Sequence, residues 1–168
     1  MTEKEAATEK SMDLLRMAIA KSRLLKPQTE EKIGVTPTAL VIGGGISGMT
    51  AASNLGKQGF KTYIIEKDKI LGGNLNNLNI LYPIQQEASI FLNEIKAEVE
   101  NNNNIQVFLE SKINDIRGYI GNYDVIIEDS KKEIHNLKIG TIIVATGGQE
   151  LKPEGLFQYK KGNQNVIT

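Results

Sequence analysis

The spacing of apolar and polar residues predicts a long helix at the start of the chain. Large apolar side chains recur among Lys, Glu and Arg from about residue 3 to residue 25, and Pro27 ends this amphipathic pattern. A polar connector over residues 28–37 follows. Because an apolar stripe usually faces a core, we expect the helix to pack on its own domain or to act as a linker. The alternative is that it anchors a partner.

Short apolar runs then flank a helix of small residues. A strand over residues 39–42 leads into a glycine turn and a helix that begins near Ile46 and is closed by Gly59. A second apolar strand follows and ends at Glu66. This order is that of a βαβ unit, in which two parallel strands are joined by one helix.

The remaining pattern predicts one more helix and a group of strands. Residues 74–86 are polar and irregular, and residues 87–100 have the spacing of an amphipathic helix. Gly121-Asn122 is a turn signal between two strands of a predicted β-meander. Strands are expected at residues 105–109, 113–120, 123–128, 133–139 and 141–145.

Together these elements predict an α/β protein with a three-layer, Rossmann-like fold. It has a parallel sheet and a β-meander insert, and an N-terminal helix precedes it. We expect the helix within residues 1–27, the connector at 28–37 and a nucleotide-binding domain at 38–150. The meander is expected at about 105–139, and a tail over 151–168 leads to a segment that lies beyond this sequence.

The turn of the βαβ unit carries a dinucleotide-binding fingerprint. Gly43, Gly45 and Gly48 form G-x-G-x-x-G, and Glu66 follows about twenty residues later, as the fingerprint requires. Glycine permits the tight exit from the strand, the approach of a pyrophosphate and the close packing of helix on sheet. The first N–H groups of the helix face the phosphates, and Glu66 can accept two hydrogen bonds from ribose hydroxyls. The alternative is a βαβ unit whose glycine turn binds no ligand.

The composition of the chain narrows the classes of function that the protein can have. The 20 basic and 20 acidic residues cancel, which argues against a nucleic-acid or membrane-surface protein. There is no apolar run of membrane-spanning length and no signal peptide, so we expect a cytoplasmic protein. The sequence has no cysteine and a single histidine, His135, which we expect on a solvated strand face. No disulfide, His-based triad or metal site is therefore expected.

Two further small-residue turns follow strands of the predicted sheet. Gly72 and Gly73 come after the second strand, and Ala145-Thr146-Gly147 comes after the last one. Ligands of open α/β sheets bind at the carboxyl ends of the strands. We therefore interpret both turns as candidates for cofactor contact. For Gly72-Gly73 an ordinary turn is an equally good interpretation.

The order of these parts resembles the FAD-binding half of the two-dinucleotide-binding-domain flavoproteins. A closer resemblance is to the A subunit of heterodisulfide reductase, a flavin and iron–sulfur protein. Residues 118–122, Gly-Tyr-Ile-Gly-Asn, and the N-terminal helix at 17–25 are the more specific parts. The other segments that carry the resemblance are residues 41–52, 71–74, 140–147 and 165–168.

The resemblance implies an FAD-binding domain that takes part in flavin-based electron transfer with other subunits of an electron-transfer complex. The sequence departs from the family pattern, because the cysteine motifs, the ferredoxin insert and the second nucleotide-binding domain are absent. A short turn at residues 129–132 stands where that insert would be expected. We therefore interpret the chain as a piece of a longer polypeptide that is inactive alone, with iron–sulfur clusters only in the missing parts.

The resemblance and the fingerprint together define the candidate site. No residue suggests a catalytic acid, base or nucleophile, and Tyr82 is a possible flavin-side contact by position alone. An NAD(P)-binding module and an interaction domain that has lost its cofactor are the alternatives, and Glu66 disfavours NADP because it would repel a 2′-phosphate. The expected cofactor-binding residues are Gly43, Gly44, Gly45, Ile46, Ser47, Gly48, Glu66, Lys67, Gly72, Gly73, Asn74, Lys112, Ile113, Ala145, Thr146 and Gly147.

Overall fold

The chain divides into two compact units. The computed structural model describes residues 3–27, 30, 32–149, 151–156 and 159, so most of the predicted tail lies outside the described residues. Residues 1–33 make up the first unit and residues 34–168 the second. Among the described residues, no helix is both long enough and apolar enough to cross a membrane.

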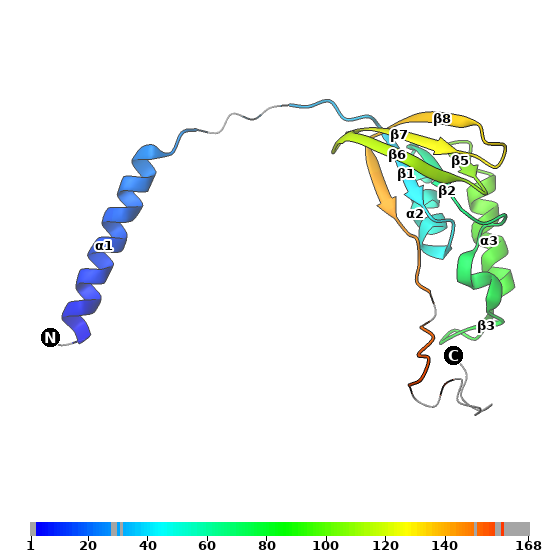
Figure 1. The fold of residues 1–168 in the computed structure, drawn as a ribbon, viewed down its shortest axis with the longest axis horizontal. Helices are drawn as coiled ribbons and strands as arrows, with labels where there is room; N and C mark the ends of the chain where they lie inside the picture. Colours follow the sequence, from blue (N-terminus) through cyan, green and yellow to red (C-terminus); the bar gives the residue numbers. More distant parts are fainter. Residues whose placement is uncertain (1–2, 28–29, 31, 150, 157–158, 160–168) are drawn as a thin grey trace. The chain divides into compact units, whose positions relative to one another are not determined.

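Helix α1 of the first unit spans Glu3–Leu24, within the predicted range (Figure 1). Acidic residues lie in its first turn and Lys21 and Arg23 in its last, where each sign of charge is favoured by the helix dipole. Asp13 and Arg16 form an ion pair one turn apart on its surface, 3.0 Å between Oδ1 and Nη1. The packing or linking role expected for α1 stays a prediction.

A four-stranded parallel sheet forms the centre of the second unit, with the order β5-β2-β1-β9. The inner strands β1 and β2 are largely buried, as their nearly continuous apolar sequences predict. Because all four strands run the same way, their carboxyl ends meet at one edge of the sheet. The strands are β1 (Thr38–Ile42), β2 (Lys61–Ile65), β5 (Ile105–Phe108) and β9 (Thr141–Val144).

Two helices, α2 (Ile46–Lys57) and α3 (Ala88–Glu100), cover one face of this sheet. The apolar core between them contains Val41 and Ile64 from the strands, Met49 and Ala52 from α2, and Leu92, Ile95 and Val99 from α3. At its rim, Glu98 of α3 accepts hydrogen bonds from Ser53 (2.6 Å) and Lys57 (2.7 Å) of α2. These contacts fix α2, and therefore its N-terminus, against the sheet.

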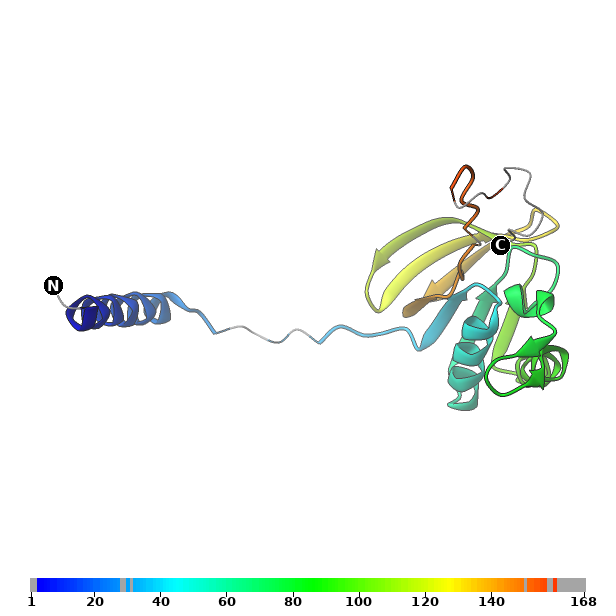
Figure 2. The same cartoon turned by 90° about the horizontal axis from the view of Figure 1, so that it is seen from below.

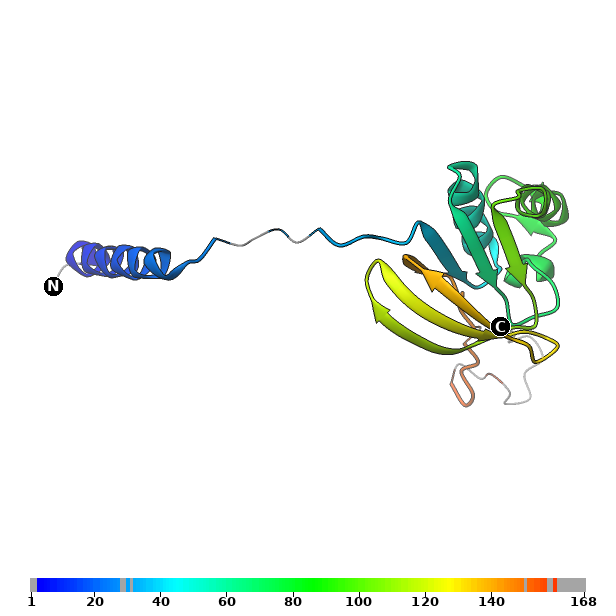
Figure 3. The same cartoon turned by 90° about the horizontal axis from the view of Figure 1, so that it is seen from above.

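An antiparallel meander, β6-β7-β8, covers the opposite face. Val125, Ile127 and Ile139 pack against Leu40 and Tyr63 of the parallel sheet in a second core. Figures 2 and 3 show the helices and the meander on opposite sides of the parallel strands. The predicted three-layer α/β arrangement is therefore confirmed. The meander strands are β6 (Lys112–Tyr119), β7 (Asn122–Glu128) and β8 (Ile134–Ile139).

The meander begins later than the predicted residue 105. Strand β5, Ile105–Phe108, pairs in parallel with β2, with Thr62 opposite Ile105 and Ile65 opposite Phe108. The physical reason is the crossover through α3, which returns the chain in the direction of β2 and so allows only a parallel partner. The sequence pattern of a four-residue strand carries no information about which sheet it joins.

The segment expected to be irregular, residues 74–86, has local structure. A 3₁₀ helix, η1, spans Gly73–Asn77, and a short hairpin joins β3 (Ile80–Leu81) to β4 (Gln86–Glu87). The Tyr82–Pro83 peptide bond in the tip of this hairpin is cis. The segment leads directly into α3.

Candidate functional site

The turn from β1 into α2 depends on two glycines at close backbone contacts. Gly43 has φ +108°, and a Cβ built there would lie 2.3 Å from the carbonyl oxygen of Ala145. A Cβ on Gly48 would lie 1.9 Å from the carbonyl oxygen of Gly43, so only glycine lets α2 approach the turn this closely. The tight exit from the strand expected at Gly43 and the close helix packing expected at Gly48 are therefore seen in the structure.

The N-terminus of α2 opens onto free space. Gly45 is its N-cap, with no side-chain cap, and a Cβ built on Gly45 would meet no atom within 4 Å. The N–H groups at the start of a helix carry partial positive charge and bind anions. An anion can thus reach the backbone of this turn without displacing any side chain.

Glu66 lies at the end of β2 and holds two loops together. Its side chain is buried, with 6% of the residue exposed. Oε2 accepts a hydrogen bond from the backbone N–H of Gly44 at 2.6 Å, and Oε1 accepts one from the N–H of Asp68 at 3.0 Å. The sequence predicts that Glu66 can accept two hydrogen bonds from ribose hydroxyls, which would leave both oxygens free in the unbound protein. Instead each oxygen already has a backbone donor, although each also has a second lone pair for a further bond.

The second glycine turn packs directly on the first. The N–H of Gly72 donates to the carbonyl of Gly44 at 2.8 Å, and Gly45 and Gly72 form an isolated parallel bridge. Asn76 of η1 holds this turn by donating to the carbonyls of Leu71 (3.1 Å) and Gly73 (3.2 Å). The Gly72-Gly73 turn is therefore part of the same structural unit as the fingerprint.

The third turn, Ala145-Thr146-Gly147 after β9, lies on the other side of the glycine fingerprint. The N–H of Ala145 donates to the carbonyl of Ile42 at 2.8 Å, which extends the pairing of β9 with β1 into the turn. Asn74 reaches across to the carbonyl of Gly148 at 3.5 Å. The turns after β1, β2 and β9 thus meet at the carboxyl edge of the parallel sheet.

These turns line a cleft of about 1260 Å³. Every cofactor-binding residue expected from the sequence lines it except Gly44 and Gly48. Tyr82 does not line it and is 95% exposed, so the structure gives no support to its role as a flavin-side contact. The sequence reasoning missed several lining residues, among them Asp68, Leu75, Asn77, Ser111, Gln149 and Lys152.

The signal for two of the missed residues was present in the strand pattern. Asp68 follows the end of β2 and Ser111 follows the end of β5, both at the carboxyl edge of the sheet. The backbone N–H of Ser111 donates to the carbonyl of Glu66 at 3.0 Å, which places the two segments side by side. With residues 105–109 predicted in the meander, the pattern does not indicate Ser111 at this edge.

Charges of both signs surround the cleft. Lys67, Lys112 and Lys152 line it together with Glu66 and Asp68. Lys112 is held by Glu128, at 3.1 Å between Nζ and Oε1. A hydrogen bond from Asn114, and then the one from Lys112, lowers the pKa of Glu128 below its ordinary value.

His135 lies outside this cleft, and its predicted setting on a solvated strand face is wrong. It is partly buried, its ring centroid lies 5.2 Å from that of Phe108, and its Nε2 lies 2.9 Å from Oδ2 of Asp129. The reason is register, because His135 shares the inward face of β8 with Leu137 and Ile139.

Comparisons with known proteins agree with this geometry. The family model described as pyridine nucleotide-disulphide oxidoreductase matches residues 37–168. The A subunit of the H(2):CoB-CoM heterodisulfide,ferredoxin reductase of Methanothermobacter marburgensis is 40% identical over 134 residues, which are 80% of this chain and 20% of that protein. The expected resemblance to this kind of protein is therefore confirmed.

A second relative extends the match over the N-terminal helix. The A subunit of the ferredoxin/F(420)H(2)-dependent CoB-CoM heterodisulfide reductase of Methanosarcina acetivorans is 29% identical over 164 residues, 97% of this chain and 21% of its own length. The chain thus spans about a fifth of the length of these relatives. Among solved structures, L-proline dehydrogenase from P. horikoshii has a TM-score of 0.59 at 22% identity, over 74% of this chain and 25% of that one, which is a likeness of fold.

Proposed function

Because the chain belongs to the pyridine nucleotide-disulphide oxidoreductase family, we propose that its cleft binds the adenosine diphosphate part of FAD. The observation that carries this proposal is the placement of a buried carboxylate, Glu66, beside the uncovered N-terminus of α2. A carboxylate that accepts from ribose hydroxyls and a helix N-terminus that binds a pyrophosphate are the two groups that this ligand requires.

The arrangement of the cleft fits this part of the cofactor. The free space beside Gly45 leaves room for phosphate oxygens at the backbone. The volume of about 1260 Å³ exceeds the range of about 300–1,000 Å³ usual for small-ligand pockets, as a long cofactor requires. Asn74, Ile113 and Thr146 line the cleft along with the glycine turns and would contact the remainder of the cofactor.

When bound, FAD would supply the redox chemistry through its isoalloxazine ring. The residues of this chain bind and orient it, and none of those that the structure describes has the setting of an acid, base or nucleophile. In the parent protein we propose electron transfer of the heterodisulfide reductase type, together with other subunits, because the relatives are named as subunits of such reductases. The cytoplasmic location expected from the sequence stays a prediction.

Iron–sulfur clusters would have to be bound elsewhere in the parent polypeptide. The sequence contains no cysteine, so it offers no thiolate ligand for a cluster. The isolated chain is accordingly expected to bind the nucleotide without completing an electron path.

A titration with flavins and nucleotides tests the proposal. FAD is titrated into the purified protein and its flavin fluorescence is followed, with ADP and FMN as competitors. We expect FAD to bind, ADP to displace it and FMN to leave it in place, because FMN lacks the adenosine that Glu66 would recognise. Equal displacement by FMN, or failure of FAD and ADP to bind at millimolar concentration, would contradict the proposal.

The same titration separates the alternatives. Binding of NADH but not FAD would identify an NAD-binding module, which the fingerprint alone allows. Binding of no nucleotide by the parent protein would favour a domain that has lost its cofactor. If the domain does bind a nicotinamide cofactor, Glu66 favours NAD over NADP, since its carboxylate would repel the 2′-phosphate.

A further inference from the structure

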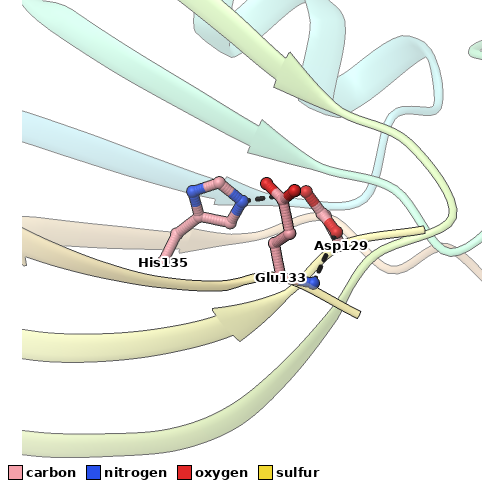
Figure 4. A group of neighbouring side chains, drawn as sticks. All are labelled: Asp129, Glu133 and His135. Carbon is pink, nitrogen blue, oxygen red and sulfur yellow. Dashed lines mark hydrogen bonds and ion pairs between the residues drawn. The ribbon is translucent and has the colours of Figure 1, made fainter. Parts of the chain in front are cut away.

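Three potential metal ligands meet at the turn between β7 and β8, outside the cleft. Asp129 follows the last residue of β7, Glu133 precedes β8, and His135 is the second residue of β8. One donor atom from each of the three lies within 4.8 Å of the other two. Figure 4 shows the imidazole and both carboxylates directed toward one another. None of the three lines the cleft.

The backbone of the turn orients the Asp129 carboxylate. Its Oδ1 accepts hydrogen bonds from the N–H groups of Lys131 and Glu133, both at 2.9 Å. This leaves Oδ2 directed at Nε2 of His135, 2.9 Å away. The imidazole is itself held against the ring of Phe108, with 33% of the side chain exposed. Two of the three donors are therefore already in position.

We propose that Asp129, Glu133 and His135 bind a divalent first-row transition-metal ion with the ligand preference of zinc. Zinc takes imidazole nitrogen and carboxylate oxygen at about 2.0–2.2 Å, and its tetrahedral geometry places neighbouring donor atoms roughly 3.3–3.6 Å apart. The 2.9 Å between Oδ2 and Nε2 is a hydrogen-bond distance, and the two atoms need to separate by only about 0.5 Å for an ion to take the place of the proton between them. Glu133 is exposed, so its side chain can rotate to complete the set.

The donor types decide which ions fit. A site with an imidazole is unsuited to Mg²⁺ and Ca²⁺, which require oxygen ligands, whereas zinc, nickel and cobalt accept nitrogen readily. Two carboxylates balance the charge of a divalent ion. Three protein ligands leave a coordination position for water. The ion would link the β7–β8 turn to the first residues of β8 and so stabilise the meander, independently of any nucleotide in the cleft.

The composition of the chain makes this site simple to test. His135 is the only histidine and there is no cysteine, so an imidazole signal on metal binding can come from this site alone in an untagged protein. Zn²⁺ is titrated into the full 168-residue chain at pH 7.5 and the heat is measured, while the ring protons of His135 are followed by NMR. We expect one equivalent to bind, the ring resonances to shift, and the melting temperature to rise.

Variants separate this site from adventitious binding. His135→Gln and Glu133→Gln should each weaken Zn²⁺ binding at least tenfold, and Glu133→Gln does so without disturbing a buried contact, because that side chain is exposed. Asp124→Asn, an exposed carboxylate of β7 paired with Lys138, is the matched control and should leave the affinity unchanged. Equal binding by Glu133→Gln and the control, or unmoved His135 resonances at millimolar Zn²⁺, would overturn the proposal and leave an Asp–His hydrogen bond as the whole function of the cluster.

Discussion

Replacing Glu66 should reduce the stability of the free protein as well as its affinity for FAD. The side chain is 6% exposed and accepts two backbone hydrogen bonds, one of them fully buried at Gly44. In Glu66→Ala the buried N–H of Gly44 loses its partner, and the partly buried N–H of Asp68 must find water. A buried donor without a partner costs about 1–3 kcal/mol and a net hydrogen bond about 1 kcal/mol, so we expect a loss of about 2–4 kcal/mol.

Chemical unfolding measures this loss. At about 2 kcal/mol per molar urea, typical of a small domain, the midpoint should fall by about 1–2 M. The sequence has no tryptophan, so far-UV circular dichroism is the suitable signal. Glu66→Gln keeps one acceptor oxygen and should lose about half as much stability as Glu66→Ala. Glu94→Ala removes an exposed carboxylate of α3 and should stay within about 0.5 kcal/mol of the parent.

The same variants test the ribose role separately. In buffer where all variants are folded, Glu66→Ala should bind FAD about 1–3 kcal/mol more weakly, the magnitude of a charge-assisted hydrogen bond. Unchanged stability would show that the two backbone bonds do not form in solution. Lower stability with unchanged FAD affinity would refute only the contact with ribose.

Four further variants have expected outcomes. Gly48→Ala should lower the free energy of unfolding, measured by urea denaturation, by about 3 kcal/mol, because its Cβ would lie 1.9 Å from a backbone oxygen. The Cβ of Gly45→Ala would meet no atom within 4 Å, so this variant should stay folded but bind FAD roughly tenfold more weakly. The hydrogen bond from the His135 ring lowers the pKa of Asp129. The stabilisation from this bond is therefore present above the pKa of Asp129 in the unfolded chain, and it is lost as pH falls through the lower pKa of the folded protein. Asp129→Asn should flatten the fall of the urea midpoint between about pH 5 and pH 2, measured with a chelator present. Tyr82→Ser should leave FAD affinity within about twofold, since the ring is exposed outside the cleft.

The sequence predicted the elements that depend on local pattern. The helix expected at residues 87–100 spans Ala88–Glu100, and the glycine fingerprint lies between a buried strand and a helix as required. Both follow from the spacing of apolar residues and from the few residue types that allow a tight turn. The carboxyl ends of parallel strands then indicate where a ligand binds, which is why most of the expected residues line the cleft.

The predictions that are wrong concern contacts between residues that are distant in the sequence. The pattern groups β5 with the meander because four residues do not specify a neighbouring strand, whereas the crossover through α3 makes β5 a parallel partner of β2. The prediction for His135 has the wrong face of β8, because one register step exchanges the two faces of a strand. Glu66 accepts hydrogen bonds from the backbone of two loops, and this depends on loop positions that only the assembled sheet determines.

Main-chain contacts join the three turns of the cleft, and the buried side chain of Glu66 and the amide of Asn76 reinforce them. Gly72 pairs with Gly44, Ala145 pairs with Ile42, and Gly48 rests on the carbonyl of Gly43. The shape of the cleft therefore depends on these contacts and not on the exposed side chains that line it, such as Lys67 and Lys152. Replacing Lys67, Lys152 or another solvent-facing lysine should alter what the cleft selects while its frame stays in place. Specificity could thus be changed without rebuilding the frame of the cleft.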